Sequence, residues 1–256
     1  MRLDSQAMTR SLLAATPLGW VATLAGLCSI VLESCQTAPS SMGVSDAELE
    51  AFRGSAEVES LLSRMTLEDK VGEMTQLTLD MLCVGELSER KDIYVILDEP
   101  HTLDAEKLTE AFEQGRVGSV LNCGGHGYTT EKWRELVSGI QEASLEAKGI
   151  PTLYGVDAIH GATYTTGAAL GPQQIALAAT WDTSLVRKMA EGTAREIYAC
   201  GIPWNFAPVL DVGRDPRWPR FWETFGEDVK LVGDMGEAMV RGFQNGPCKG
   251  GETLGG

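Results

Sequence analysis

Residues 213–228, GRDPRWPRFWETFGED, gather three arginines, four aromatic rings and four carboxylates in one short stretch. A guanidinium group offers a rigid fork of donors, a carboxylate accepts hydroxyl protons, and an aromatic ring can lie against the C–H face of a pyranose. Together these groups could grip a sugar. They could also pair with one another and hold a long loop in shape, which is the interpretation we favour for Arg214, Asp215, Glu227 and Asp228.

A second stretch that could do chemistry is YGVDAIHG, at residues 154–161. Asp157 follows the apolar run IPTLYGV, so we expect its carboxylate at the carboxyl end of a buried strand. A carboxylate in that position is costly unless something hydrogen-bonds to it. A ligand hydroxyl and a backbone cap from the following loop are both suitable partners, and the spacing does not decide between them.

The segments that would position these residues alternate between strand and helix patterns. Apolar residues recur every three or four positions in stretches typical of helices, whereas short continuous apolar runs indicate buried strands. The expected helices are 55–65, 67–77, 104–115, 129–149, 183–201 and 227–244, and the expected strands are 117–122, 150–157 and 202–212. Repeated strand–helix units predict an α/β fold with parallel strands joined by right-handed crossovers.

Polar, glycine-rich segments follow the expected strands, namely NCGGHG, DAIHGATYTTG and GRDPRWPRFWETFG. In a (β/α)₈ barrel the site is built at this end of the strands, and the same is true of a doubly wound sheet. About four strands can be placed, whereas a complete barrel needs eight. Half a barrel would leave two open strand edges, so we interpret the chain as an incomplete copy of a larger protein.

Composition excludes one class of partner. The 256 residues carry 36 acidic and 21 basic side chains, for a formal net charge of -15. Phosphate binding needs a basic face, so no nucleic-acid partner is expected, and a neutral ligand fits better. The stretch NCGGHGYTT lacks the third glycine of a dinucleotide-binding turn. The scattered Cys83, Cys123, Cys200 and Cys248 show no metal-ligand spacing, so neither a metal nor another cofactor is expected.

The first forty residues have the layout of a secretory signal. Arg2 and Arg10 precede an apolar run from Leu12 to Leu32, which is also long enough to span a bilayer. LESC, which ends at Cys35, resembles a lipoprotein cleavage box, although Glu33 stands where a small residue is usual. We therefore expect an exported protein, periplasmic or an outer-membrane lipoprotein, that touches a membrane only through this lipid or an uncleaved signal.

Several motifs follow one another in the order of a known family. MTLEDKVGEMTQ, IPTLYGVDAIHG, ALAATWDTSLV, NFAPVLDVGRDPRWPRFWETFGED and GEAMVRGFQ resemble the β-glucosidase-type N-terminal barrel of glycoside hydrolase family 3, over residues 56–246. The resemblance implies about the first half of a (β/α)₈ TIM-type barrel. It also implies retaining, exo-acting hydrolysis of terminal β-D-glucosyl residues, or of β-xylosides. Around this region we expect a linker at 41–55 and a disordered tail at 247–256.

The resemblance also carries over to single residues. It implies that Asp157 binds sugar hydroxyls in subsite −1 and that Arg220 belongs to the same pocket. Glu223 matches a family acid of the same loop, either as a ligand or as a brace. Pro219 replaces the usual glycine and restricts the backbone beside the ligand. His160 matches a family histidine that we interpret as structural.

The resemblance assigns no catalytic residue to this chain. A retaining glycosidase needs two carboxyl groups roughly 5–5.5 Å apart. In the family the nucleophile is an aspartate in an S-D-W-type segment on a later strand, after a lysine–histidine pair, and the acid/base usually comes from a following domain. None of these segments is found after Gly246, and the one SD, at Ser45–Asp46, lies in the lead-in. The chain alone is therefore expected to be inactive.

Two alternatives to the glucosidase interpretation stay open. One is the β-N-acetylhexosaminidase branch of the same family, against which the stretches GVDAIHG and RDPRWPR argue. The other is a non-catalytic, lipid-anchored carbohydrate-binding module. Trp218 and Trp222 could stack on sugar in either case, although we expect at least one of them to pack the loop.

Overall fold

The computed structural model describes residues 56–85 and 100–244. The expected signal at 1–40, with its cleavage box, and the expected linker at 41–55 lie outside the described residues. The expected tail at 247–256 lies outside them as well.

The chain divides into two units, residues 1–63 and 64–256. The described part of the first unit lies in the helix α4 (Ala56–Arg64), which confirms the helix expected from the apolar spacing. Its Leu61 and Leu62 side chains are exposed. Within the described ranges, no helix is long and apolar enough to cross a bilayer.

The centre of the second unit is a parallel sheet whose strands follow one another in chain order, β1-β2-β3-β4. The strands are β1 (Gln76–Thr78), β2 (Ser119–Leu121), β3 (Leu153–Val156) and β4 (Trp204–Asn205). Each pairs with the next in parallel, as the strand–helix alternation predicts. A doubly wound sheet reverses its strand order at a switch point, whereas a barrel adds its strands one after another. The sequential order is therefore that of a barrel.

One helix prediction was too long. The helix α5 (Leu67–Glu73) begins at a capping box between Thr66 and Asp69, but it does not reach residue 77. The Ser119 N–H of β2 donates to the Thr75 carbonyl at 3.2 Å, which recruits the following residues into the sheet as β1. Pairing with a strand 44 residues away overrode the helical spacing of the sequence.

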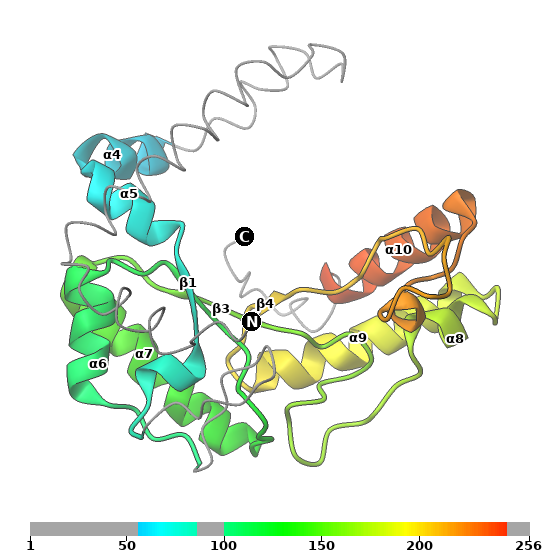
Figure 1. Ribbon diagram of the computed structural model, residues 1–256, viewed down its shortest axis with the longest axis horizontal. Helices are drawn as coiled ribbons and strands as arrows, with labels where there is room; N and C mark the ends of the chain where they lie inside the picture. The colour runs from blue at the N-terminus through cyan, green and yellow to red at the C-terminus, as the bar shows by residue number, and fades with distance from the viewer. Residues whose placement is uncertain (1–55, 86–99, 245–256) are drawn as a thin grey trace, which may run out of the picture. The chain divides into compact units, whose positions relative to one another are not determined.

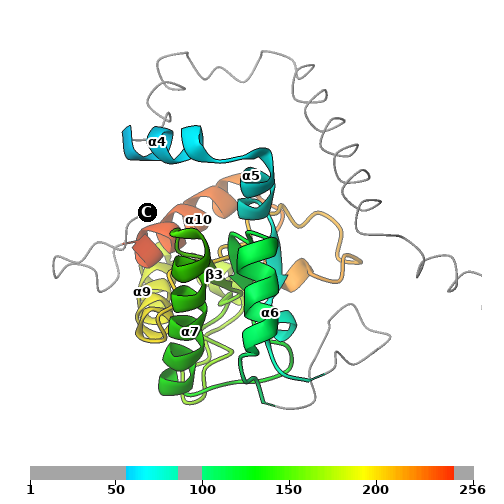
Figure 2. The same ribbon diagram turned by 90° about the vertical axis from the view of Figure 1, so that its left-hand side faces the viewer.

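Except for α8, the remaining helices agree closely with the sequence. They are α6 (Ala105–Thr109), which continues as a π-helix (Glu110–Gln114), α7 (Thr130–Lys148), α8 (Gln174–Ala178), α9 (Thr183–Ala199) and α10 (Val229–Gln244). The Thr129 side chain caps α7 by accepting the Lys132 N–H, and Gly149 ends it in the left-handed conformation. Figures 1 and 2 show α6 and α7 side by side, and Figure 1 shows α9 beside α10. The five-residue α8 was not predicted.

Two apolar clusters hold the second unit together. The larger one packs the sheet against α6 and α7 around Phe112, Trp133 and Tyr154, all with 0% exposure. The smaller one joins α8, α9 and α10 around Val186 and Met239. The segment that follows β3 leads from Ala158 and Ala162 in the larger cluster to Leu177 in the smaller one.

The expected strand at 202–212 is mostly not a strand. β4 covers two residues, and pairing with β3 stops after the Phe206 N–H donates to the Val156 carbonyl at 3.0 Å. Pro208 has no N–H to continue the ladder, and Asn205 turns its side-chain oxygen onto the Ala207 N–H at 3.2 Å. The apolar residues that follow, Leu210 and Val212, line a groove and are not part of the sheet.

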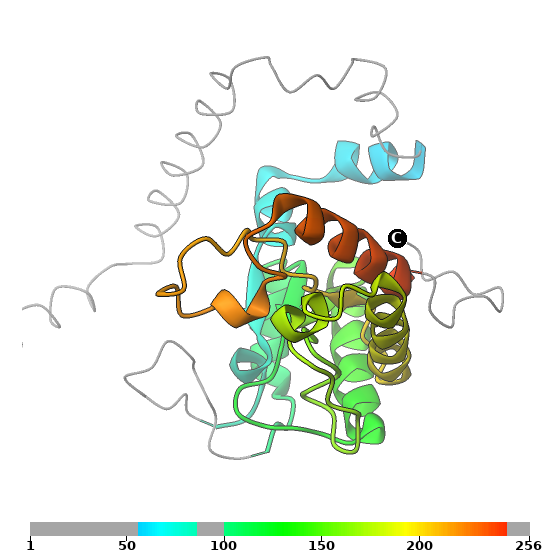
Figure 3. The ribbon, with the colours of Figure 1, turned by 90° about the vertical axis from the view of Figure 1, so that its right-hand side faces the viewer.

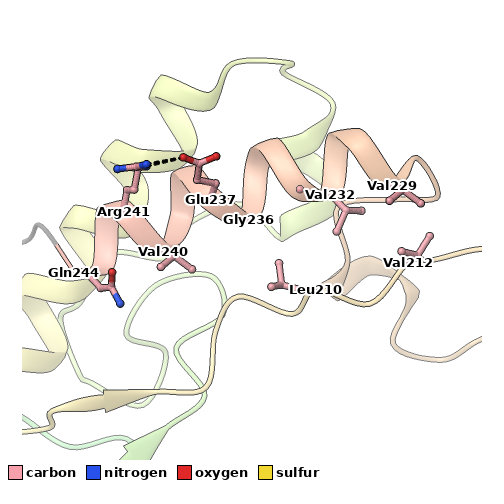
Figure 4. A pocket seen from close by; sticks show the side chains of 10 residues that line it. Leu210, Val212, Val229, Val232, Gly236, Glu237, Val240, Arg241 and Gln244 are labelled. Carbon is pink, nitrogen blue, oxygen red and sulfur yellow. Dashed lines mark hydrogen bonds and ion pairs between the residues drawn. The ribbon is translucent and has the colours of Figure 1, made fainter. Parts of the chain in front are cut away.

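The groove has a volume of about 680 Å³ and lies between α10 and the segment after β4 (Figure 4). Leu210 and Val212 line one side, and Val229, Val232 and Val240 of α10 line the other. β4 is an edge of the described sheet, because it pairs with β3 alone there. The described part of the chain therefore leaves an open strand edge and an uncovered apolar groove, as expected for part of a barrel.

Two glycines give opposite predictions for stability. Gly149 has φ +68°, a conformation that costs an alanine about 1 kcal/mol, whereas Gly192 lies in the interior of α9 with open space around it. We expect Gly149→Ala to lower the free energy of unfolding by about 1 kcal/mol and Gly192→Ala to raise it by about 0.5–1 kcal/mol. Urea unfolding followed by tryptophan fluorescence measures both, and equal signs would contradict either the end of α7 at Gly149 or the place of Gly192 inside α9.

Candidate functional site

Asp157 lies at the carboxyl rim of the sheet, directly after β3, and it is half-buried. Its Oδ2 accepts a hydrogen bond from Asn122 Nδ2 at 2.7 Å, and its backbone N–H donates to Asn122 Oδ1 at 2.8 Å. The Asp157 carboxylate therefore has one protein side chain as a partner, from the residue that follows the neighbouring strand β2. Its Oδ1 has no hydrogen-bond partner among the described residues.

Asn122 follows β2 directly and is tied to β3 by its backbone as well. Its N–H donates to the Gly155 carbonyl at 2.9 Å, and its carbonyl accepts from the buried Tyr154 hydroxyl at 2.7 Å. Its φ is +47°, a left-handed conformation that asparagine tolerates better than most residues. These contacts leave the side-chain amide of Asn122 little freedom to turn away from Asp157.

Arg220 and Glu223 form the other side of the candidate site, in the segment between β4 and α10. Both Nε and Nη2 of Arg220 donate to Glu223 Oε2, at 2.9 and 2.5 Å. The Arg220 side chain is 56% exposed and that of Glu223 15% exposed, so the carboxylate lies beneath a guanidinium that faces solvent. Figure 3 shows this segment, in orange, extending away from α10.

Asp157 and Arg220 are electrostatic neighbours. The pKa of Arg220 is raised, first by its hydrogen bond to Glu223. The negative charges of Asp157 and Asp211 raise it further, although burial acts in the opposite direction. The charge of Asp157 therefore reaches an arginine that is far away in the sequence.

Other residues of the arginine-rich segment have local partners. Arg217 forms a bidentate pair with Asp215, with Nη2 to Oδ2 at 2.6 Å. Asp228 caps α10 by accepting the Leu231 N–H at 2.7 Å. Pairing within the loop is therefore found for Asp215, but with an arginine that the sequence analysis did not select. Trp222 is half exposed.

A buried polar network behind the rim was missed by the sequence analysis. Asp80 lies two residues after β1, in a short 3-10 helix (Leu79–Leu82). It accepts from Gly124 N–H at 3.2 Å and contacts His101 Nε2 at 3.1 Å. His101 Nδ1 lies 2.5 Å from the Tyr128 hydroxyl, which also accepts the His101 backbone N–H at 2.8 Å. The Tyr128 proton can then donate to Nδ1, which leaves a proton on Nε2 for Asp80. Burial raises the pKa of Tyr128 to about 12.

This network braces the loop that begins at Asn122. Asp80 holds the loop at Gly124, the Cys123 thiol donates to the His126 carbonyl at 3.0 Å, and Tyr128 ends it. Asp80 could have been found by a signal related to the one that found Asp157, a carboxylate shortly after a strand. It was missed because β1 was taken for the end of a helix.

In the part of the chain that the structure describes, His160 has a backbone partner and the cysteine thiols are buried. His160 Nδ1 lies 3.2 Å from the Gly171 carbonyl. Burial raises the thiol pKa of Cys83 and of Cys123 to about 12, so neither is a thiolate near neutral pH. Within the described ranges no group of three histidine, cysteine or acidic residues could hold a metal ion.

A parallel sheet in sequential order, with polar side chains at its carboxyl rim, defines the class of α/β-barrel proteins that bind ligands at that rim. The profile of the glycosyl hydrolase family 3 N terminal domain matches residues 66–250, well over half of the chain. The chain therefore belongs to glycosyl hydrolase family 3, as its motifs predict.

Several known proteins with similar sequences or structures are described as glucosidases or glucanases. A lysosomal beta glucosidase of Dictyostelium discoideum is 36% identical over 201 residues, which are 74% of this chain and 23% of the relative. A periplasmic beta-glucosidase of Salmonella typhimurium is 31% identical over 187 residues, 73% of this chain and 20% of the relative. The crystal structure of an exo-1,3/1,4-beta-glucanase from a Pseudoalteromonas species superposes with a TM-score of 0.60 at 32% identity, covering 74% of this chain and 22% of that chain.

The chain thus spans less than a quarter of the length of these three proteins. The likeness confirms the expected fold, the first part of a (β/α)₈ TIM-type barrel.

Proposed function

We propose that the chain is the sugar-binding part of an exo-acting glycoside hydrolase that releases terminal β-D-glucosyl residues. The observation that supports this proposal is that the negative charge of Asp157, at the carboxyl end of β3, reaches the Arg220 guanidinium and helps to raise its pKa. A carboxylate and a guanidinium within electrostatic reach of each other can accept from one sugar hydroxyl and donate to another. The similarity to beta-glucosidases supports glucose as the sugar.

In this proposal the three site residues have distinct roles. Asp157 accepts hydrogen bonds from hydroxyls of the non-reducing sugar through Oδ1, and Arg220 donates to a neighbouring hydroxyl. Glu223 holds the guanidinium from below, because its Oε2 already accepts both Arg220 donors. No residue of the chain is assigned as the catalytic nucleophile or acid/base, so the chain alone is expected to bind sugar without hydrolysing it.

Export belongs to the proposal as well. The basic and apolar residues before Leu32 support a secretory signal, and the Salmonella relative is described as periplasmic. A lipid on Cys35 would anchor the chain to a membrane. Labelling expressed cells with a radioactive fatty acid, with Cys35→Ser as the control, tests the lipid separately from the sugar site.

The test of the proposed function is a titration of the 256-residue chain with methyl β-D-glucoside, followed by NMR or tryptophan fluorescence. We expect saturable binding with a dissociation constant of about 1 mM, which corresponds to roughly −4 kcal/mol. Methyl β-D-xyloside, which lacks the hydroxymethyl group, tests the xyloside alternative. Absence of saturable glucoside binding would contradict the proposal, and turnover of an aryl β-glucoside would contradict the assignment of no catalytic residue.

Two alternatives are separated by the same titration. Tighter binding of methyl N-acetyl-β-D-glucosaminide than of the glucoside would favour the hexosaminidase branch. A module that only binds carbohydrate would prefer longer β-linked oligosaccharides to the single sugar, since an exo-acting site is built around one terminal residue.

A further inference from the structure

The strongest unassigned feature at the rim is the pairing of Asn122 with Asp157. Both polar side-chain atoms of Asn122 bond to Asp157. Nδ2 donates to the carboxylate, and Oδ1 accepts the backbone N–H. The bond to the carboxylate fixes Oδ2, and the bond to the backbone fixes the turn that carries it. Of the two carboxylate oxygens, Oδ1 is then the one turned to other partners, since no described residue hydrogen-bonds to it.

The chemistry of this position suits an asparagine and not its nearest analogues. A serine has one hydroxyl and could not serve both the carboxylate and the backbone N–H at once. An aspartate would put a second carboxylate 2.7 Å from Asp157 Oδ2 and repel it. The amide supplies a neutral donor and an acceptor in a fixed geometry.

We propose that Asn122 is a positioning residue of the sugar site, which orients the Asp157 carboxylate so that Oδ1 faces a sugar hydroxyl. This inference rests on the proposed function and deepens it. Asn122 itself need not touch the sugar. It acts through Asp157, and the loop that carries it is held by Asp80 through Gly124 and by Tyr154.

The test variant is Asn122→Asp, which keeps the size, the tolerance of a left-handed φ and the acceptor for the Asp157 N–H. It loses the donor to Asp157 Oδ2. Near neutral pH we expect about tenfold weaker binding of methyl β-D-glucoside by the full chain. Two carboxylates this close take up one shared proton at a higher pH than an isolated carboxyl group, and a protonated carboxyl group at position 122 restores the lost donor.

The expected signature is therefore a recovery of affinity with falling pH. The deficit of Asn122→Asp relative to the unchanged chain should shrink from about tenfold at about pH 7.5 to about twofold near pH ~5.5. The charged groups that face this pair are Arg220, with Glu223 and Asp211 acting on the same guanidinium, and Asp80 behind the loop. All of them are present in both proteins, so the ratio of affinities isolates residue 122.

Ser144→Ala is the matched control. It removes a buried hydroxyl that donates to the Ile150 carbonyl, at the other end of β3 from Asp157, and it leaves the Asn122 amide on the Asp157 carboxylate. We expect a lower melting temperature with glucoside affinity within twofold of the unchanged chain. If Ser144→Ala weakened binding as much as Asn122→Asp, or if the Asn122→Asp deficit did not vary with pH, the positioning role would be wrong.

A second measurement needs no sugar. In the unchanged chain, the Asn122 side-chain amide protons should exchange with solvent more slowly than those of an exposed asparagine, and Asp157→Ala should abolish this protection. Fast exchange in the unchanged chain would overturn the inference even if Asn122→Asp did not fold. Absence of glucoside binding combined with protected amide protons would instead refute the proposed function and leave the Asn122–Asp157 contact standing.

Discussion

His101→Ala is expected to lower the free energy of unfolding by about 3–5 kcal/mol, among the largest losses available in this chain. The side chains of His101 and Asp80 have 0% and 1% exposure, and Nε2 of the histidine lies 3.1 Å from the carboxylate. Removing the imidazole takes a close hydrogen-bond partner from a carboxylate that stays buried. It also leaves the Tyr128 hydroxyl without its ring partner.

Urea unfolding followed by the fluorescence of the buried Trp133 measures this loss. His101→Gln is a partial rescue, because its amide can still donate to Asp80, and we expect it to recover about half of the lost stability. His160→Ala is the matched control, since that half-buried ring contacts a neutral backbone carbonyl, that of Gly171, and not a buried carboxylate. A loss below about 1 kcal/mol for His101→Ala would mean that the network carries little of the stability.

The sequence predicted the residues at the carboxyl rim of the sheet better than it predicted the residues that hold them in place. Asp157 was found because it ends a continuous apolar run, and that run is β3. The caps of α7 at Thr129 and Gly149 could be read locally, since capping depends on neighbouring residues. Features that depend on residues close together in the sequence could therefore be predicted.

The support of the rim could not be predicted, because it depends on pairs that are distant in sequence. Asn122 meets Asp157 from 35 residues away, and Asp80 meets His101 from 21 residues away. The sequence of β1 looks helical until β2 is placed beside it, so Asp80, two residues after β1, was not recognised. The sequence also left open whether the sheet belongs to a barrel or to a doubly wound fold. That choice depends on the order of the strands, which is known only once the strands are paired.

Arg220→Ala is expected to weaken binding of methyl β-D-glucoside by about 10- to 100-fold, the range for losing a hydrogen bond to a charged group. Glu223→Ala should cost less, about fivefold, if it acts only by holding the guanidinium in place. The double variant then should bind no more weakly than Arg220→Ala alone, because a brace has no effect once the residue it holds is gone. Isothermal titration of the unchanged chain, both single variants and the double variant completes the cycle.

The same segment offers a close control in Arg217, whose side chain is 89% exposed and pairs with Asp215 as Arg220 pairs with Glu223. The raised pKa of Arg217 comes from Asp215, with no contribution from Asp157, in contrast to Arg220. Arg217→Ala should therefore change glucoside affinity by less than about twofold, as expected of an exposed ion pair away from the ligand. Additive losses for Arg220→Ala and Glu223→Ala would make Glu223 a direct ligand of the sugar, because independent contacts sum in free energy. Equal losses for Arg217→Ala and Arg220→Ala would remove the distinction on which the proposed sugar site depends.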